Sequence, residues 1–455
     1  MNTNELIEMD LRHFWHPCAQ MKDYADFPPM AVESAKGSKL FLKDGRVILD
    51  GISSWWCKSL GHAHPRIKKA FLEQVNRFEH VIMANCCAET VAELCSSLAE
   101  TIPGLSRVFL AENGSVSVEI AIKMSLQYHA QSGHPEKKHF LSLENAYHGE
   151  TILTLAAGDS DFYSGPFRHL LPHIGKLAPV PYLDGPDSPL WNNMPEEDWK
   201  KMETILDSHA QNLAGVLVEP VLQGAGGMKL YSPDLLRRLR KWTKDHGVHL
   251  IADEIFTGFG RTGEMMACQH AEILPDIATL SKGMTSGFVP LAAVMTTEEI
   301  YNAFYGDYLS GRAFVHSTTY SGYAPAAAAA LEVLKVYREE QILESVRSRG
   351  RSLLERMKRI AASSGGALSH VRGIGFVAAA DIVNPETGCP FPKNERTGFE
   401  FYKNAARLGA LLRPIGDSFY FLPPLNTPEE ELDQLADIAE KALRLTLAGK
   451  KVSHS

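Results

Sequence analysis

The chain has 455 residues, of which 45% are hydrophobic and 22% are charged, a composition typical of a globular enzyme with a large core. Its net charge is −8 and it contains no basic run, which argues against nucleic acid and anionic membranes as partners. The most apolar long run, Ala324 to Leu334, is too short to cross a bilayer. Seven cysteines without a CxxC pair, and no apparent signal peptide, predict a cytoplasmic location. The histidines lack the acidic or cysteine partners of a metal site, so no metal is expected.

Residues 1–30 are polar, aromatic and punctuated by prolines, which predicts an irregular strap at the N-terminus. Pro17 disfavours helical geometry at His16, so a regular helix cannot continue through this segment. The aromatic side chains of such a strap are suited to lining a substrate pocket.

A strand–turn–strand pattern over residues 39–50, with Asp44-Gly45 at the turn, predicts a hairpin. The hairpin leads into Trp55 and Trp56, which suit a binding wall as well as a core.

A helix from His64-Pro65 opens the next part of the chain, and an apolar run at 108–110 predicts a strand. Gly114 and Ser115 then precede a helix over 116–131. Free N–H groups at a helix N-terminus bind anions, so we predict a phosphate cradle here. The next strand, 139–142, leads to Tyr147, an aromatic that can lie on the face of a pyridine ring.

Three short apolar runs follow a Pro/Gly-rich loop region at 158–193, and each leads to a charged residue. Such runs are typical of buried parallel strands, and their alternation with helices predicts a doubly wound, mainly parallel sheet. Ligands bind at the carboxyl ends of strands in such sheets, so the charged residues are offered to one crevice. The runs and their charged residues are 214–218 with Glu219, 249–252 with Asp253, and 277–280 with Lys282.

The C-terminal part predicts a small α/β domain. A long helical region spans Ala324 to about Ser363, strands are expected at 371–376 and 419–422, and Thr427-Pro428-Glu429-Glu430 has the pattern of a capping box. We therefore expect an N-terminal strap with part of the small domain (1–60), a large domain (61–330) and a C-terminal small domain (331–455).

A carboxylate and an amine offered to one crevice suit pyridoxal phosphate (PLP). The aldehyde of PLP needs a lysine that binds it covalently, and its ring nitrogen needs a carboxylate that keeps it protonated. Lys282 and Asp253 fit these roles, although an isolated lysine or aspartate is usually a surface or capping residue. A competing dinucleotide-binding motif, Gly258-x-Gly260-x-x-Gly263, is separated from its strand by four residues, which disfavours a nicotinamide cofactor.

The sequence around these residues resembles the class III (ω-type) aminotransferases. The resemblance is carried by Asp253-Glu254-Ile255, Thr257-Gly258-Phe259-Gly260-Arg261-Thr262-Gly263 and Ser281-Lys282-Gly283, in this order and spacing. It implies PLP-dependent transferase fold type I, with a large domain and a smaller α/β domain built from both chain ends.

The resemblance covers about residues 12 to 445 and narrows to the adenosylmethionine-8-amino-7-oxononanoate aminotransferase family. The segments that carry it are Trp15-His16-Pro17, Asp50-Gly51-Ile52-Ser53-Ser54-Trp55-Trp56, Gly114-Ser115-Val116-Ser117-Val118-Glu119, Gln223-Gly224-Ala225-Gly226-Gly227-Met228 and Arg413-Pro414-Ile415-Gly416 with Tyr420. That family implies transamination of 8-amino-7-oxononanoate to 7,8-diaminononanoate in biotin biosynthesis, with S-adenosylmethionine as amino donor. It also implies a homodimer whose active sites are shared between subunits.

The resemblance implies a role for each matching residue. Lys282 is the PLP-binding lysine, Asp253 the partner of the ring nitrogen, and Tyr147 stacks on the ring. The remaining residues divide into cofactor-binding and substrate-binding groups: Gly114, Ser115, Glu219, Thr318 and Thr319 for the cofactor, with Thr319 reaching the phosphate of the other subunit, and Trp55, Ser317, Arg413, Tyr420 and Arg261 for the substrate.

The sequence departs from the family pattern in four places, of which three are single residues. Cys18 replaces a tyrosine that closes over the substrate in some members, Asn113 replaces a commoner serine, and Glu150 stands where aspartate is usual. These three bear on donor identity and substrate geometry. Ser317-Thr318 with Gly322-Tyr323-Ala324-Pro325 is the fourth departure and bears on the subunit contact near the phosphate.

Two other functions share part of this pattern. A general ω-amino-acid:pyruvate aminotransferase also carries the Asp253/Lys282 pair. A non-catalytic PLP-binding regulator would usually carry a DNA-binding domain, and no basic helix-turn-helix segment is visible. Arg413 has a structural alternative as well, as an arginine paired with Glu150 or Asp417.

Overall fold

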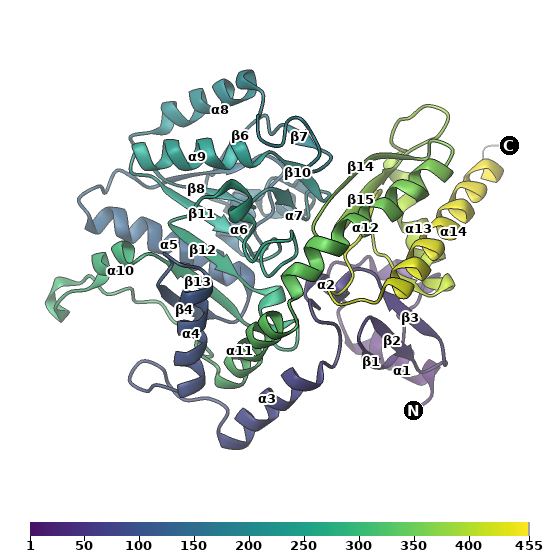
Figure 1. The fold of residues 1–455 in the computed structure, drawn as a ribbon, viewed down its shortest axis with the longest axis horizontal. Coiled ribbons are helices and arrows are strands. Elements are labelled where there is room, and N and C mark those ends of the chain that lie inside the picture. The colour runs from purple at the N-terminus through teal and green to yellow at the C-terminus, as the bar shows by residue number, and fades with distance from the viewer. Residues whose placement is uncertain (454–455) are drawn as a thin grey trace.

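The computed structural model describes residues 1–453 and is organised around a seven-stranded sheet (Figure 1). Six strands of this sheet run parallel, and β13 alone runs antiparallel to both of its neighbours. The mainly parallel sheet confirms the prediction, whereas β13 was not predicted. In sheet order the strands are β4 (Arg107–Ala111), β13 (Ala292–Thr296), β12 (Ile277–Leu280), β11 (His249–Asp253), β8 (Leu213–Val218), β5 (His139–Leu143) and β6 (Gly175–Leu177).

Both faces of the sheet are covered, because successive side chains of a strand point to opposite faces. On β11, Leu250 packs with the cluster that holds α9, while Ile251 packs with the cluster that holds α5. This double burial explains why the central strands are continuously apolar rather than alternating. The helices of this part of the chain are α3 (Pro65–Arg77), α4 (Glu89–Thr101), α5 (Gly114–Gln131), α6 (Ile152–Ala157), α7 (Asp161–Ser164), α8 (Glu196–His209), α9 (Pro233–Asp245), α10 (Glu298–Phe304) and α11 (Ala324–Glu339).

The two ends of the chain meet in one four-stranded sheet. The predicted hairpin forms as β2 and β3, and β16 from the C-terminal part pairs parallel with β3 through Ala410 and Leu49. The expected small α/β part from both chain ends is therefore present beside the large sheet (Figure 1), while the exact domain boundaries remain predictions. The elements of this sheet and its neighbours are β1 (Val32–Lys36), β2 (Lys39–Leu42), β3 (Val47–Asp50), α2 (Ser53–Trp56), α12 (Ile342–Ser363), β14 (Leu368–Ile374), β15 (Val377–Ile382), α13 (Thr397–Leu408), β16 (Ala410–Leu411), β17 (Ser418–Phe421) and α14 (Glu429–Ser453).

The N-terminal strap is less irregular than predicted. Residues Thr3–His13 form helix α1, which begins with a capping box in which Asn2 and Glu5 exchange side-chain to backbone hydrogen bonds. The prediction was wrong here because it gave weight to Pro17 and missed this local cap. The helix does end before Pro17, and a 3₁₀ turn at Met21–Ala25 follows.

The segment 158–193, predicted to be a loop, contains short regular elements. It supplies β6 at one edge of the large sheet and β7 (Tyr182–Leu183), which pairs with β10 (Lys229–Tyr231) in a three-stranded sheet with β9 (Leu222–Gln223). Strands of two or three residues are too short to produce a readable apolar pattern. Tertiary pairing, rather than local sequence, forms them.

Three boundaries in the C-terminal part also differ from prediction. The long helical region divides into α11 and α12, because Gln341 adopts a left-handed conformation with φ 51°. The strand expected at 371–376 runs from Leu368 to Ile374, and Gly375 (φ +52°) turns the chain into β15. Helix α14 begins at Glu429, one residue later than the predicted capping box requires, and the Thr427 hydroxyl donates to the carbonyl of Pro424.

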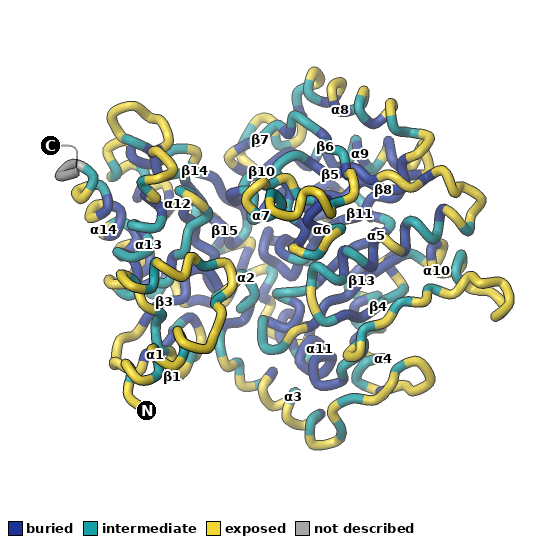
Figure 2. The backbone as a smooth tube through the Cα atoms, turned by 180° about the vertical axis from the view of Figure 1, so that it is seen from behind, coloured by how far each residue is buried: buried dark blue, intermediate teal, exposed yellow. Residues whose placement is uncertain are grey.

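Figure 2 shows the buried residues concentrated along the large sheet and in the region between it and β15, and exposed residues at the loop tips. No helix in the described part of the chain is long and apolar enough to span a membrane.

Candidate active site

Asp253 and Lys282 lie at the carboxyl ends of two adjacent parallel strands. Asp253 is the last residue of β11 and pairs in register with Thr279 of β12. Lys282 follows three residues after Thr279, so the structure brings both residues to the same edge of the sheet, as the sequence predicted.

The Asp253 carboxylate is only 6% exposed and is held by several donors. His148 Nδ1 lies 2.8 Å from Oδ2, and the Thr279 hydroxyl and the Ile255 amide donate to Oδ1 at 3.3 and 3.2 Å. Sequence reasoning did not predict the role of His148, because it is 105 residues away from Asp253 along the chain. The only signal was its place beside Tyr147 at a strand end. These contacts fix the orientation of the carboxylate.

The amine of Lys282 lies among aromatic rings. Its Nζ is 4.7 Å from the ring centroid of Trp56 and 5.4 Å from that of Phe256. Burial lowers the pKa of Lys282, and the negative charges of Asp253 and Glu219 partly offset this effect. A lowered pKa increases the fraction of neutral amine, which is the nucleophilic and proton-accepting form.

Glu219 follows β8, and its side chain connects the turn at Tyr147 with the turn at Gly224. Its carboxylate accepts hydrogen bonds from the backbone N–H groups of Tyr147 and Gly224, both at 3.0 Å. Burial raises the pKa of Glu219 to about 7. Glu219 therefore holds the backbone of Tyr147, the residue predicted to stack on the PLP ring.

Gly114 and Ser115 open helix α5, whose N-cap Asn113 accepts a hydrogen bond from the Val116 amide. The neighbouring backbone approaches very closely. A Cβ on Gly149 would lie 2.1 Å from Ser115 Oγ, and one on Gly114 would lie 2.9 Å from the side chain of Ile255. The glycines thus leave free N–H groups and a hydroxyl at a helix N-terminus, which is the donor set that a phosphate requires.

Tyr147 and Glu150 form a pair on the same turn. The Tyr147 hydroxyl donates to Glu150 Oε1 at 2.9 Å, and burial raises the pKa of Tyr147. The glutamate that departs from the family pattern is thus the hydrogen-bond acceptor for the residue predicted to stack on the ring.

Trp56 and Tyr420 form an aromatic wall. The indole Nε1 of Trp56 donates to the Tyr420 hydroxyl at 2.9 Å, and burial raises the pKa of this buried tyrosine. The sequence predicted Trp56 only as one of a tryptophan pair suited to a binding wall, and its contact with Lys282 was not predicted. The structure places Trp56, rather than Trp55, against Lys282.

Trp55 and Arg413 lie together at the rim of the site. The guanidinium carbon of Arg413 is 5.2 Å from the ring centroid of Trp55, and its Nη2 donates to the carbonyl of Cys18. Both side chains line a cavity of about 310 Å³ that also includes Tyr24 of the N-terminal strap. Among the described residues, Arg413 makes no ion pair with Glu150 or Asp417.

The Arg261 guanidinium is hydrogen-bonded to other residues of the protein. Its Nη1 donates to the carbonyls of Phe376 and Pro423, at 3.1 and 2.9 Å, and its Nη2 lies 3.4 Å from Ser53 Oγ. Burial lowers the pKa of Arg261 to about 10. The guanidinium therefore joins the large sheet region to the C-terminal part, and its contact with substrate remains a prediction.

Ser317, Thr318 and Thr319 lie in the segment between α10 and α11 and make no recorded contact with Asp253 or Lys282. Ser317 and Thr319 are exposed, while Thr318 Oγ1 lies 2.9 Å from Ser321 Oγ. The amide of Tyr320 donates to Glu112 beside the phosphate cradle. The structure leaves the predicted cofactor-binding role of Thr319 untested.

The residues present fit PLP. An amine, a buried carboxylate and a helix N-terminus with two small residues supply groups for the aldehyde, the ring nitrogen and the phosphate of that cofactor.

Comparisons with known proteins agree with this arrangement. Residues 20–443 match the model of the family "Aminotransferase class-III". An adenosylmethionine-8-amino-7-oxononanoate aminotransferase of Geobacter sulfurreducens is 37% identical over 98% of this chain and 99% of its own length. The crystal structure of the enzyme of that name from Methanocaldococcus jannaschii superposes with a TM-score of 0.91 at 30% identity, covering 97% of this chain and 99% of that one. An amine transaminase from an uncultivated Pseudomonas species, in its PLP-bound form, has a TM-score of 0.87 at 30% identity, covering 95% and 99% of the two chains.

Proposed function

The chain belongs to the class-III aminotransferases and, within them, to the adenosylmethionine-8-amino-7-oxononanoate aminotransferase family, and from this premise we propose its reaction. It transfers an amino group to 8-amino-7-oxononanoate, with S-adenosylmethionine as donor, and forms 7,8-diaminononanoate in biotin biosynthesis. One observation carries the proposal: the Lys282 amine and the Asp253 carboxylate share one sheet edge, with Trp55 and Arg413 at its rim.

PLP, when bound, supplies the electron-withdrawing ring that makes transamination possible. The Asp253 carboxylate would hold a proton on the ring nitrogen, and His148 and Thr279 orient that carboxylate. Lys282 would hold the cofactor covalently and, once displaced by the donor, take the proton from the amine-bearing carbon. The lowered pKa of Lys282 suits this work as a base near neutral pH.

The rim residues would select the acceptor, a nine-carbon chain with a carboxylate at one end and an amino ketone at the other. Trp55 and the wall of Trp56 and Tyr420 supply apolar surface for the chain. The Arg413 guanidinium would bind the terminal carboxylate through two parallel hydrogen bonds, a geometry that lysine cannot reproduce.

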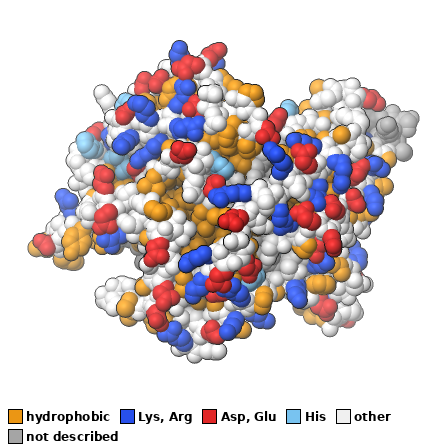
Figure 3. Space-filling model, viewed as in Figure 1, with side chains coloured by type: hydrophobic (Ala, Val, Ile, Leu, Met, Phe, Trp, Pro, Cys, Tyr) orange, Lys and Arg blue, Asp and Glu red, His pale blue; other side chains and the backbone are white. Residues whose placement is uncertain are grey.

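We also propose a cytoplasmic homodimer that shares its active sites. Large apolar side chains are exposed on the segment that follows α10, including Tyr308 and Leu309. This segment projects at the left edge of the molecule in Figure 1, and Figure 3 shows apolar side chains on that projection. Exposed apolar patches of this kind mark interaction surfaces. Thr319 lies on the same exposed segment, and the proposal is that it reaches the phosphate cradle of the second copy.

The test is a reaction of the purified protein with 8-amino-7-oxononanoate and, separately, adenosylmethionine, lysine or an ω-amino acid, with 7,8-diaminononanoate measured by mass spectrometry. We expect product with adenosylmethionine. Product with lysine alone would change the donor and leave the acceptor in place. Transfer from ω-amino acids to pyruvate, without diaminononanoate, would replace the proposal by the general ω-aminotransferase reaction.

A further inference from the structure

The turn that carries the two tryptophans has an unfavourable backbone conformation. Ser53, Ser54 and Trp56 have φ values of 51°, 58° and 64°, although none of them is glycine. The Cβ atom of any residue other than glycine crowds the backbone at positive φ, and such a conformation persists only where the surrounding structure holds it in place. The cause must therefore be sought in the groups that contact the turn.

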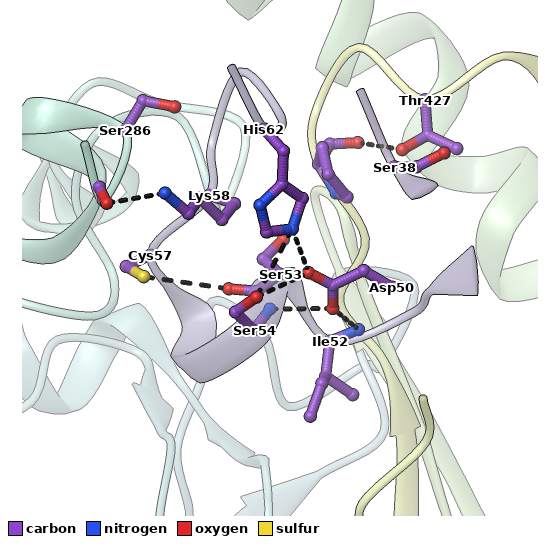
Figure 4. A network of polar contacts seen from close by, with 12 residues as sticks. Ser38, Asp50, Ile52, Ser53, Ser54, Cys57, Lys58, His62, Ser286 and Thr427 are labelled. Carbon is purple, nitrogen blue, oxygen red and sulfur yellow. Dashed lines mark hydrogen bonds and ion pairs between the residues drawn. The ribbon is translucent and has the colours of Figure 1, made fainter. Parts of the chain in front are cut away.

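Asp50, at the end of β3, is the centre of these contacts (Figure 4). Its carboxylate is 1% exposed and accepts hydrogen bonds from the Ser54 amide at 2.7 Å and the Ser54 hydroxyl at 2.8 Å. The Ile52 amide is a third, longer donor at 3.4 Å. His62 Nε2 lies 2.8 Å from Oδ2 and closes the network from the far end of the turn. Four donors thus converge on two oxygens, which only a carboxylate can satisfy.

His62 is itself fixed to the sheet. Its backbone N–H and C=O pair with Gly37, at 2.7 and 3.0 Å, next to the hairpin strand β2. The imidazole therefore joins Asp50 to a second point of the N-terminal sheet, and the turn between residues 50 and 62 is held at both ends.

The other side of this turn holds the backbone that follows Lys282. The Ser59 hydroxyl donates to the carbonyl of Gly283 at 3.1 Å, and the Leu60 amide donates to Ser286 Oγ at 2.8 Å. Lys58 Nζ donates to the carbonyl of Gly287 at 2.6 Å. Together with the ring of Trp56, 4.7 Å from the Lys282 amine, these contacts connect the turn to the reactive lysine from two directions.

We propose that Asp50 and His62 are positioning residues, which hold the strained turn 51–60 so that it fixes both the Lys282 amine and the backbone of residues 283–287. The inference rests on the proposed function in that Lys282 is taken as the PLP-binding lysine. Among the described residues the pair makes no hydrogen bond with Lys282 or Asp253, and it acts through Trp56 and Ser59. The carboxylate is essential to this role, since the amide nitrogen of an asparagine in its place would face two of the four donors.

The test compares Asp50→Asn with Asp276→Asn in the full-length protein as purified. Asp276 is a matched control, because its partly buried carboxylate also accepts backbone and side-chain donors, from Leu250 and Arg240, but at the amino end of β12. Amide hydrogen exchange is measured by mass spectrometry. In Asp50→Asn we expect exchange at least about tenfold faster in residues 51–60 and in residues 283–287, with β8 and β11 unchanged. In Asp276→Asn these two segments should keep their native rates.

A kinetic signature accompanies the exchange pattern. Displacing the amine by a fraction of an ångström should lower kcat of Asp50→Asn by about tenfold or more. His62→Gln, which keeps the carboxylate and its other donors, should show the same pattern to a smaller extent, and it replaces Asp50→Asn as the test if that variant does not fold. Faster exchange in 51–60 alone, with 283–287 at native rates, would overturn the proposal. So would a uniform loss of protection across the sheet. The exchange pattern needs no substrate, so a wrong substrate assignment would leave it intact, whereas unchanged exchange would overturn the inference in an active enzyme.

Discussion

The inner and outer parts of the site are built in different ways. The inner part consists of Asp253 and Lys282, which follow neighbouring strands, and the carboxylate is buried and held by three donors. The outer part consists of Trp55, which is 51% exposed, and Arg413, whose only hydrogen bond is to the carbonyl of Cys18 within the described residues. The regular sheet fixes the groups for the common chemistry, whereas loops from distant parts of the sequence present the groups that select a substrate. Substitutions in the inner part should therefore slow the reaction of every substrate, whereas substitutions in the outer part should slow the reaction of only some.

Loss of the inner lysine should have the largest effect. Lys282→Ala removes both the covalent hold on the cofactor and the base, so turnover should fall by more than about 10⁴-fold, even if PLP still binds. Borohydride should fix the cofactor onto Lys282 in the native protein, as shown by peptide mapping. Lys229→Ala, which changes a lysine beside Tyr182, should remain active. A label on any other lysine would remove Lys282 from its role.

Loss of the Asp253 carboxylate should have the second largest effect on turnover. Asp253→Asn keeps the shape but loses the charge that holds the ring nitrogen protonated, so kcat should fall by about 10²- to 10³-fold. KM should change less, because the lost interaction acts on the transition state. Steady-state kinetics with Asp276→Asn as control would measure both constants. A kcat near the native value would show that Asp253 does not support the ring.

The outer arginine should matter only for the acceptor. Charge-assisted hydrogen bonds are worth roughly 1.5–3 kcal/mol, so Arg413→Ala should slow the acceptor half-reaction by about 10- to 150-fold. Arg413→Lys should recover little of this loss. Arg396→Ala is the matched control, because Arg396 lines the same cavity but is committed to a bidentate pair with Asp23. The native enzyme should prefer the acceptor over its methyl ester, and an unchanged preference in Arg413→Ala would assign the carboxylate to another residue.

The opposite end of β11 should affect stability but not catalysis. His249 packs against His129 with ring centroids 4.5 Å apart and ring planes tilted by 31°, and burial lowers the pKa of His129 to about 4 and that of His249 well below its usual value. In the unfolded chain each imidazole takes up a proton near pH 6.5, whereas in the folded chain it stays neutral. The contribution of these histidines to the free energy of unfolding is therefore fully present above pH 6.5 and is lost as the pH drops toward 4. Urea unfolding should show a loss of at least about 2 kcal/mol between pH 8 and pH 5.

His249→Gln should flatten this pH dependence and leave the activity at pH 8 within about twofold of native. If its unfolding free energy keeps the native slope between pH 8 and pH 5, the buried histidine pair is not the source of the acid sensitivity.

The same contrast explains how far the sequence could be interpreted. The apolar runs that end at Asp253 and before Lys282 predicted their strands and shared edge, because a strand buried on both faces has a direct sequence pattern. The partner of Asp253, His148, and the support of the Trp56 turn by Asp50 and His62 could not be predicted, because they depend on contacts between distant segments. Strand β13 was missed for a related reason, since an antiparallel strand inside a parallel sheet is defined only by its neighbours. Helix α1 was missed despite a readable local cap.

The most direct test of the contrast between inner and outer parts measures the two half-reactions separately, by stopped-flow absorbance of the bound cofactor. Adenosylmethionine is mixed with the native PLP form, and 8-amino-7-oxononanoate with the aminated form, for the native protein, Asp253→Asn and Arg413→Ala. The account predicts that Asp253→Asn slows both half-reactions by similar factors. It predicts that Arg413→Ala slows the acceptor half-reaction by about 10- to 150-fold and leaves the donor half-reaction within about threefold of native. Equal slowing of both half-reactions by Arg413→Ala would contradict it, because the outer arginine would then act on the common chemistry.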